Sequence, residues 1–243
     1  MNTLVFKMSM VVKDKKDNGN YLSDNDPVVH LMGLVRNCSE QSKRTLIANQ
    51  NLFCTLDWEG NSVLNHAVCS NNLLSLQIIC QSNFFKVIKN IPNRDGDYPV
   101  SYAALDGKCD ILQYLLNIGC RILVGVGKDG CPPCLLQEVI CRNINTSQVL
   151  DILFKDLSNN EKYPASEVNY MLSKVGYVET YGDVNPYQLA CAMRKDDIAR
   201  KIEEFSANYN RQIPVDKSQY FRRPDFNIDH LNVYFTNKLN ISK

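Results

Sequence analysis

The sequence predicts an all-α solenoid of helix-turn-helix units with short β-hairpin connections, closed by capping helices. Three observations lead to this fold class. Similar segments recur along the chain, and each contains a turn glycine. Apolar residues at helical spacing follow each turn. Residues that start and end helices flank these apolar stretches. One such helix pair cannot bury its own apolar faces, so several pairs must stack.

The turn glycines of the four copies mark the period. The second copy follows the first by 36 residues, the third follows the second by 34, and the fourth follows the third by 52, as read from Gly60, Gly96, Gly130 and Gly182. We therefore expect roughly 19 extra residues inside the third copy, relative to an ordinary repeat period.

The second copy shows most clearly why these residues form a helix pair. Pro99 is suited to the first helical turn, where its missing N–H costs nothing. Gly107 and Gly119 are placed to end the two helices, because glycine readily adopts the left-handed conformation found there. Ile111, Leu112, Leu115 and Leu116 then form an apolar stripe at helical spacing.

These features resemble those of the ankyrin-repeat family. Its pattern combines a period near 33 residues, an Asp-Gly turn, a T-P-L-H-like helix start and an I-x-x-x-L-L second helix. The second copy, from Asn93 to Cys120, matches best. It keeps Asp95-Gly96, Pro99, Ala103-Ala104, Gly107, Asp110-Ile111, Leu115-Leu116 and Gly119. The resemblance covers about residues 57–205 and implies an ankyrin-type stack.

The other copies depart from the family pattern at the helix start. The first has Val63 and Asn65 where Pro and His would stand. The third has Leu135 at the expected His position, if it is aligned on Gly130 with Pro133 over Pro99, and the fourth has Gln188 there.

The remaining segments suggest the following organisation. Residues 1–25 are expected to be an N-terminal arm and residues 26–54 a pair of capping helices, with Asp26 as an N-cap and Pro27 at the first position. Four repeats occupy 55–205, with an inserted helix at about 155–178. Residues 206–243 are rich in aromatic residues and are expected to form a C-terminal capping segment.

Composition narrows the function. Twenty-seven Lys and Arg against 26 Asp and Glu leave a formal charge of +1, which argues against a dedicated nucleic-acid binder. We expect no membrane span, because no apolar run approaches about 18–20 residues. Ten cysteines scattered through apolar contexts are typical of buried thiols in a reducing compartment. We therefore expect a cytoplasmic protein.

Several patterns could carry chemistry, and none is specific. Cys131-Pro-Pro-Cys134 could be a redox dithiol or half of a zinc site, but it coincides with a helix start and lacks a second cysteine pair. His66 and Cys69 could share a helix face, yet nothing supplies an oxyanion hole. No phosphate-binding loop is present. We expect no catalytic residues, no metal and no cofactor.

The resemblance implies a binding surface instead. In ankyrin stacks the hairpin tips and the first helix of each unit line a concave groove. The tip and helix residues expected to contact a partner are Trp58, His66, Arg94, Asp95, Tyr102, Lys128, Leu136, Tyr181 and Leu189.

The function expected from this resemblance is non-enzymatic protein binding by a monomer. The divergent repeats also resemble those of effectors of intracellular bacteria and of viral host-interaction proteins. This suggests a eukaryotic host protein as the partner and translocation into a host cell. Two alternatives stay open. One is a ubiquitin-ligase substrate adaptor that uses the helices between Asp26 and Ala48, and the other is a thiol-dependent enzyme that uses Cys131 and Cys134.

Overall fold

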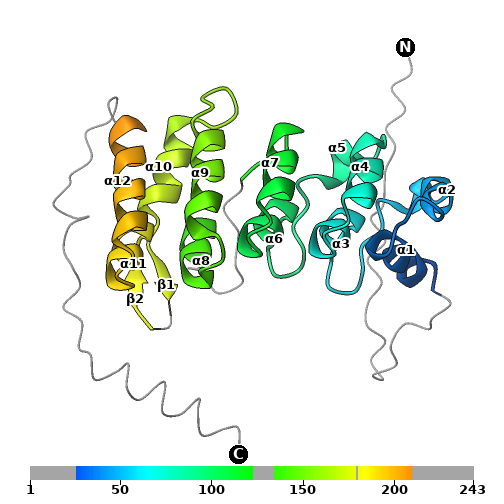
Figure 1. The fold of residues 1–243 in the computed structure, drawn as a ribbon, viewed down its shortest axis with the longest axis horizontal. Coiled ribbons are helices and arrows are strands. Elements are labelled where there is room, and N and C mark those ends of the chain that lie inside the picture. Colours follow the sequence, from blue (N-terminus) through cyan, green and yellow to red (C-terminus); the bar gives the residue numbers. More distant parts are fainter. Residues whose placement is uncertain (1–25, 123–133, 179, 210–243) are drawn as a thin grey trace, which may run out of the picture. The chain divides into compact units, whose positions relative to one another are not determined.

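The computed structural model describes residues 26–122, 134–178 and 180–209 (Figure 1). The chain divides into two compact units, an N-terminal unit (Met1–Lys128) and a C-terminal unit (Asp129–Lys243). Both consist of helix-turn-helix pairs, and the C-terminal unit also has a two-stranded hairpin. The predicted all-α repeat class with short hairpins is therefore confirmed.

The N-terminal unit begins with a capping region and continues with two repeats. The first helix of repeat 1, α3, contacts α1 of the capping region and α6 of repeat 2, as well as its own partner α4. The elements in chain order are α1 (Pro27–Arg36), α2 (Lys43–Ala48), the 3-10 turn η1 (Gln50–Leu52), α3 (Val63–Cys69), α4 (Leu73–Gln81), α5 (Phe85–Ile88), α6 (Pro99–Leu105) and α7 (Cys109–Asn117).

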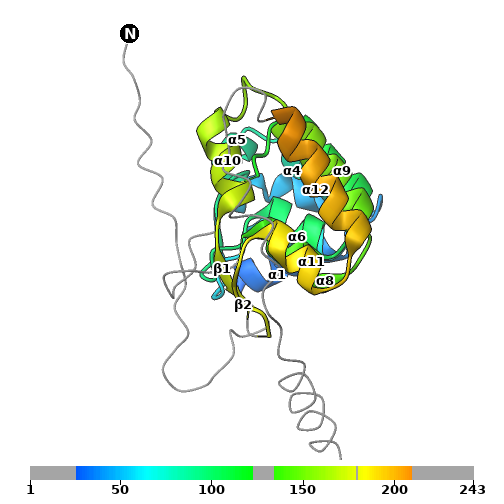
Figure 2. The same cartoon turned by 90° about the vertical axis from the view of Figure 1, so that its left-hand side faces the viewer.

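The C-terminal unit contains repeats 3 and 4. Its first helices, α8 and α11, contact each other, and so do its second helices, α9 and α12 (Figures 1 and 2). Strands β1 and β2 pair antiparallel, with Tyr177 opposite Asp183. The elements in chain order are α8 (Leu135–Arg142), α9 (Thr146–Leu157), α10 (Ala165–Ser173), β1 (Gly176–Val178), β2 (Gly182–Val184), α11 (Pro186–Ala192) and α12 (Asp196–Tyr209).

The backbone repeats with a stricter period than the glycines suggest. The left-handed residue between the two helices of a repeat is Asn71, Gly107, Asn143 or Arg194, so the spacing is 36, 36 and 51 residues. The N-caps of the first helices have the same spacing and are Ser62, Tyr98, Cys134 and Asn185. The difference between 51 and 36 leaves 15 extra residues between repeats 3 and 4, rather than the 19 expected.

The helix start of repeat 3 corrects the sequence alignment. The helix α8 begins at Leu135 with Cys134 as its N-cap, two residues later than an alignment on Gly130 places it. Gln137, not Leu135, therefore takes the third helical position. Leu136 is 1% exposed in the interior of the C-terminal unit, and Glu138 takes the position equivalent to His66 and Tyr102.

The extra residues before repeat 4 are tied down by a compact polar cluster. The Nζ of Lys162 donates to both carboxylate oxygens of Asp156 at 2.9 Å, and the Tyr163 hydroxyl donates to Asp156 at 2.6 Å. Tyr163 is completely buried. The loop therefore closes back on the end of α9 before α10 begins.

The side chain at the third position of a repeat's first helix bonds to the next repeat where it is long enough. In repeat 3 the amide nitrogen of Gln137 donates to the carbonyl of Val184, immediately before the N-cap of repeat 4. In repeat 1 the shorter Asn65 accepts from the Ser62 hydroxyl at 2.6 Å, and its buried Nδ2 has no hydrogen-bond partner. The carbonyl of Asp97 occupies the corresponding place before the N-cap of repeat 2.

In repeats 1, 2 and 4 a second side chain also crosses to the preceding helix pair. It stands immediately before the second helix and donates to carbonyls at the end of the preceding first helix, whose last carbonyls have no partner within the helix. The three donors and their acceptors are Asn72 to Arg36 and Cys38 (3.3 and 3.0 Å), Lys108 to Val68 and Cys69 (3.1 and 2.9 Å), and Lys195 to Ile140.

We predict that Asn65→Gln stabilises the N-terminal unit by about 0.5–1.5 kcal/mol, because the longer amide can reach the Asp97 carbonyl and satisfy a buried donor. Trp58, the only tryptophan, lies in this unit, so its fluorescence during urea unfolding reports the change. Gln137→Asn is the reciprocal variant and should destabilise the C-terminal unit. Loss of stability in Asn65→Gln would contradict the proposed junction bond.

Arg194 is the only residue other than Asn or Gly with a left-handed conformation in the described chain, at φ 56°. A side chain in this region is strained, and glycine is not. We therefore predict that Arg194→Gly stabilises the protein by about 0.5–1 kcal/mol in urea unfolding followed by circular dichroism. Arg194→Ala keeps the strain and serves as the control, which should show no such gain.

Candidate interaction surface

The hairpin tips of repeats 1 and 2 lie against each other. The Arg94 amide donates to the Glu59 carbonyl at 2.9 Å. Gly60 has a φ of 81°, and a Cβ there would lie 3.0 Å from the Arg94 nitrogen and 3.2 Å from its Cγ. Only glycine fits this close approach. Trp58, Glu59, Arg94 and Asp95 are all exposed and form what we call the tip surface.

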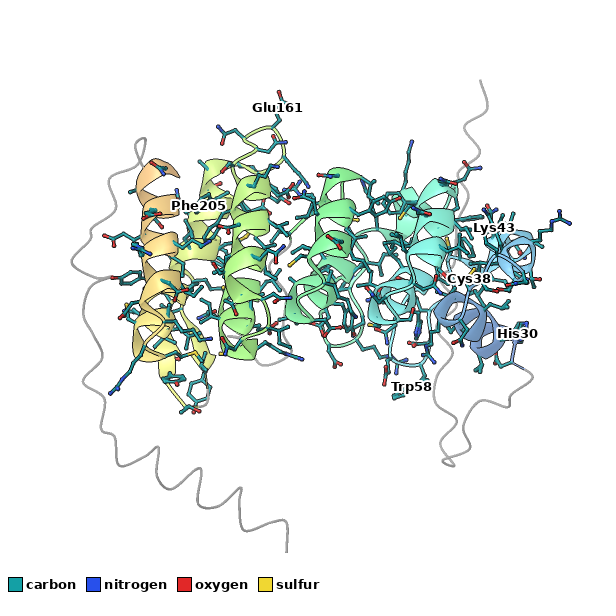
Figure 3. All side chains as sticks on the ribbon, viewed as in Figure 1. His30, Cys38, Lys43, Trp58, Glu161 and Phe205 are labelled. Carbon is teal, nitrogen blue, oxygen red and sulfur yellow. The ribbon has the colours of Figure 1, made fainter. Side chains whose placement is uncertain are left out.

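Trp58 is the most exposed large feature of this surface. It is 43% exposed and projects from the loop that precedes α3 (Figure 3). Exposure of the chain's only tryptophan on a turn, and not in the core, is typical of a contact residue.

The same side-chain turn supports both tips. In repeat 1, Oδ1 of Asp57 accepts from the amides of Glu59 and Asn61 at 2.9 and 2.8 Å. In repeat 2, Oδ1 of Asn93 accepts from the amides of Asp95 and Asp97 at 3.0 and 2.8 Å. Asp57 and Asn93 are 36 residues apart and are both buried, so each tip is rigid at its base.

His66 belongs to this base and not to the surface. It is 6% exposed, and its Nε2 lies 2.8 Å from Oδ2 of Asp57. Both Nε and an Nη of Arg36 approach its Nδ1, at 3.1 and 2.9 Å. Because arginine only donates, Nδ1 accepts, and the ring proton on Nε2 donates to Asp57.

The hydroxyl of Tyr102 connects the buried bases of the two tips by hydrogen bonds. It accepts from Nδ2 of Asn93 at 2.8 Å and donates to Oδ1 of Asn61 at 3.1 Å. Burial raises the pKa of Tyr102, and the nearby carboxylates of Asp97, Glu59 and Asp95 raise it further. The phenol is half-buried and therefore remains a protonated donor.

The other predicted contact residues are placed differently. Leu136 and Leu189 are buried in the C-terminal unit, at 1% and 0% exposure, and contribute to its interior and not to a surface. Tyr181 is partly exposed on the turn between β1 and β2. Lys128 lies outside the described residues. Within the N-terminal unit, the structure brings together Trp58, His66, Arg94, Asp95 and Tyr102.

Sequence reasoning missed five members of this site: Arg36, Asp57, Glu59, Asn61 and Asn93. A signal for three of them was present, because the Asp57/Asn61 pair recurs 36 residues later as Asn93/Asp97. Arg36 carries no such signal, since it comes from the capping helix α1 and contacts His66 only in the folded unit.

The described residues give little support to catalysis by a cysteine thiol. Both ring nitrogens of His66 are engaged, so it cannot take a proton from Cys69, whose own pKa is raised by burial. Burial raises the pKa of Cys134 to about 11, and its Sγ donates to the Met171 carbonyl at 3.6 Å. A thiol with that pKa is almost fully protonated at neutral pH. Cys131 lies outside the described residues.

No group of three or more His, Cys, Asp or Glu side chains in the described part of the chain converges so as to hold a metal ion. No helix in residues 26–122, 134–178 and 180–209 combines the length and the apolar character that crossing a membrane requires.

The base of the tips predicts a specific acid sensitivity. Burial would raise the pKa of Asp57, but hydrogen bonds from His66 and Asn61 outweigh it and lower the pKa below 3.8. A lowered carboxyl pKa stabilises the folded state above the unfolded value, and the benefit disappears as pH falls through the folded value. We therefore predict that the wild type loses more unfolding free energy than Asp57→Asn between about pH 4.5 and 2.5.

Trp58 fluorescence in urea, measured at both pH values, checks this prediction. Asp57→Asn should be less stable than the wild type at neutral pH, because the amide cannot replace the carboxylate beside His66. Equal losses on acidification in the two proteins would contradict a stabilising Asp57 carboxylate.

No protein-family model and no curated protein matches this sequence. Among solved structures, the chain is similar to an ankyrin repeat domain from Acinetobacter baumannii, with 15% identity over 74% of this chain and 91% of that chain and a TM-score of 0.45. The fold assignment rests on this chain's own geometry: the glycine turns, the helix pairs and the recurring N-caps. In these respects the described residues have the ankyrin-repeat fold.

Proposed function

We propose that this protein is a non-enzymatic scaffold that binds a partner protein through the tip surface of its N-terminal unit. The observation that carries the proposal is the 43% exposure of Trp58 on a turn whose base is buried and hydrogen-bonded. Tryptophan and arginine are enriched among the residues that dominate binding energy, and Arg94 stands beside this tip.

The rigid base of the tips favours binding, in addition to the exposure of Trp58. A surface that is ordered before binding loses little conformational entropy when the partner arrives. Asp57, Asn61, Asn93 and Tyr102 form a continuous hydrogen-bonded base, so the backbone under Trp58 and Arg94 needs no rearrangement.

The proposal includes features that rest on the sequence alone. They are a eukaryotic host protein as the partner, a host-directed effector role, a monomeric state and a cytoplasmic location. Non-enzymatic action is supported by the engaged nitrogens of His66 and by the protonated Cys134 thiol.

One observation favours the alternative of a ubiquitin-ligase adaptor. Ile47 on α2 is 42% exposed, which leaves an apolar side chain on the capping helices available to a second protein. The helix α1 is unsuited to a deletion test, because it buries Val28, Leu31, Met32 and Val35 against the unit. A single exposed substitution on α2 separates this function from folding.

We predict that Trp58→Ala and Arg94→Ala each reduce the partner's affinity by roughly tenfold, about 1–2 kcal/mol, and leave the fold intact. Quantitative affinity capture from host-cell lysate identifies partners retained by the wild type, and titration with the purified partner measures the change. Leu73→Ala is the matched control, because Leu73 is 51% exposed on the second helix α4.

The same experiment distinguishes the alternatives. Equal affinity in the wild type and both tip variants would contradict the tip surface. Loss of a cullin-adaptor complex with Ile47→Ser, together with normal behaviour of Trp58→Ala, would favour the ligase-adaptor function.

A further inference from the structure

The exposed apolar side chains of the C-terminal unit are unevenly distributed. Among its described residues, the large hydrophobic side chains that are most exposed are Ile144 (45%), Tyr170 (52%), Val175 (48%) and Tyr177 (57%). Three of these four fall within eight residues, at the end of α10 and in β1. We call Tyr170, Val175 and Tyr177 the α10–β1 patch. Their closeness in sequence distinguishes them from the singly scattered exposed hydrophobics of an ordinary surface.

Carboxylates flank both tyrosines of the patch. Glu167 precedes Tyr170 by three residues on α10, a spacing that places two side chains on one helix face. Asp183 stands directly opposite Tyr177 in the β1–β2 pair. The cation of Lys174 lies 5.8 Å from the centre of the Tyr170 ring. The patch is therefore aromatic, with two carboxylates and one ammonium group at its edge.

The chain itself contains a segment of complementary composition. Residues 210–243 follow α12 directly and contain six Lys and Arg against three Asp, a formal charge of +3. They also contain Tyr220, Phe221, Phe226, Tyr234 and Phe235, with Arg222-Arg223 beside the first two. Aromatic and arginine side chains are those most suited to an aromatic surface edged by carboxylates.

The outer face of α12 does not need to be covered by this segment. Its exposed positions include Asp196, Asp197, Arg200, Glu203 and Glu204, and its buried positions are Ile198, Ala199 and Ile202. A polar outer face is how a terminal repeat ends a stack. An aromatic segment would gain little there, in contrast to the patch.

Length and position make the contact possible. The 34 residues after Tyr209 can span up to about 110 Å when extended. The longest helix of the unit, α12, has 14 residues and is about 21 Å long. Every part of the C-terminal unit is therefore within reach of the segment.

We propose that residues 210–243 bind the α10–β1 patch within the same molecule. The contact buries Tyr170, Val175 and Tyr177 under the aromatic residues of the segment and pairs its arginines with Glu167 and Asp183. This contact is independent of the tip surface.

Tyrosine nitration by tetranitromethane in the full chain tests the contact. Peptide mass spectrometry measures the rates at Tyr170 and Tyr177, and the buried Tyr163 reports on folding. We expect the combined variant Tyr220→Ser, Phe221→Ser and Phe226→Ser to raise both rates about threefold or more, with Tyr163 still protected. Ile144→Ser is the control that should leave both rates unchanged.

A reciprocal measurement uses the patch as the altered partner. The combined variant Tyr170→Ser, Val175→Ser and Tyr177→Ser should accelerate tryptic cleavage after Arg222, and Ile144→Ser should not. Each of three results would overturn the proposal. The first is nitration of Tyr170 and Tyr177 that is as fast in the wild type as in the segment variant, and the second is cleavage after Arg222 that the patch substitutions do not change. The third is protection of the tyrosines that increases with protein concentration, because it would indicate that a second copy covers the patch.

Discussion

The structure depends on polar side chains that cross from one helix pair to the next. Helices α3 and α6 have seven residues each, too few to be stable alone in water. Their apolar faces are buried by neighbours, and amides of the following turn satisfy part of their last carbonyls, as Asn71 does for Val68. Lys108 adds a side-chain donor at the end of α3, and Lys195 does so at the end of α8. These bonds tie each second helix to the first helix of the preceding pair.

Rigidity of the tips arises from the same requirement. Asp57 and Asn93 satisfy amides that the sharp turns leave without backbone partners, and both side chains are buried in doing so. Tyr102 and Asn61 then join the two turns. Because a buried polar group is costly when its partner is lost, a change that loosens one tip would also lower the stability of the unit. Binding at Trp58 and stability of the N-terminal unit are in this sense coupled.

Much of the fold could be predicted from the sequence, and the helix start that was predicted wrongly differs for a local reason. Gly60, Gly96 and Gly182 mark the turns because all three adopt positive φ values, which few other residues accept. The start of α8 was misplaced because it was aligned on Gly130, whereas Cys134 continues the 36-residue spacing of the N-caps.

The candidate site was harder to predict, because its contacts join residues far apart in the chain. His66 aligns with the half-exposed Tyr102, yet Arg36 of α1 and Asp57 enclose it. Likewise, the sequence does not tell whether an amide at the third helical position spans the junction. One methylene decides this, since Gln137 reaches the next repeat and Asn65 does not.

The two exposed aromatic surfaces differ in how they arise from the repeat. Trp58 stands on a turn that every repeat must contain, so the buried base that the stack requires also supports the tip. The α10–β1 patch lies in and beside the extra residues between repeats 3 and 4, where Tyr163 and Asp156 fasten the loop to α9. The inserted helix α10 contacts α11, and its Met171 carbonyl accepts from the Cys134 thiol. Val168, Met171 and Leu172 are buried, and Tyr170 is 52% exposed.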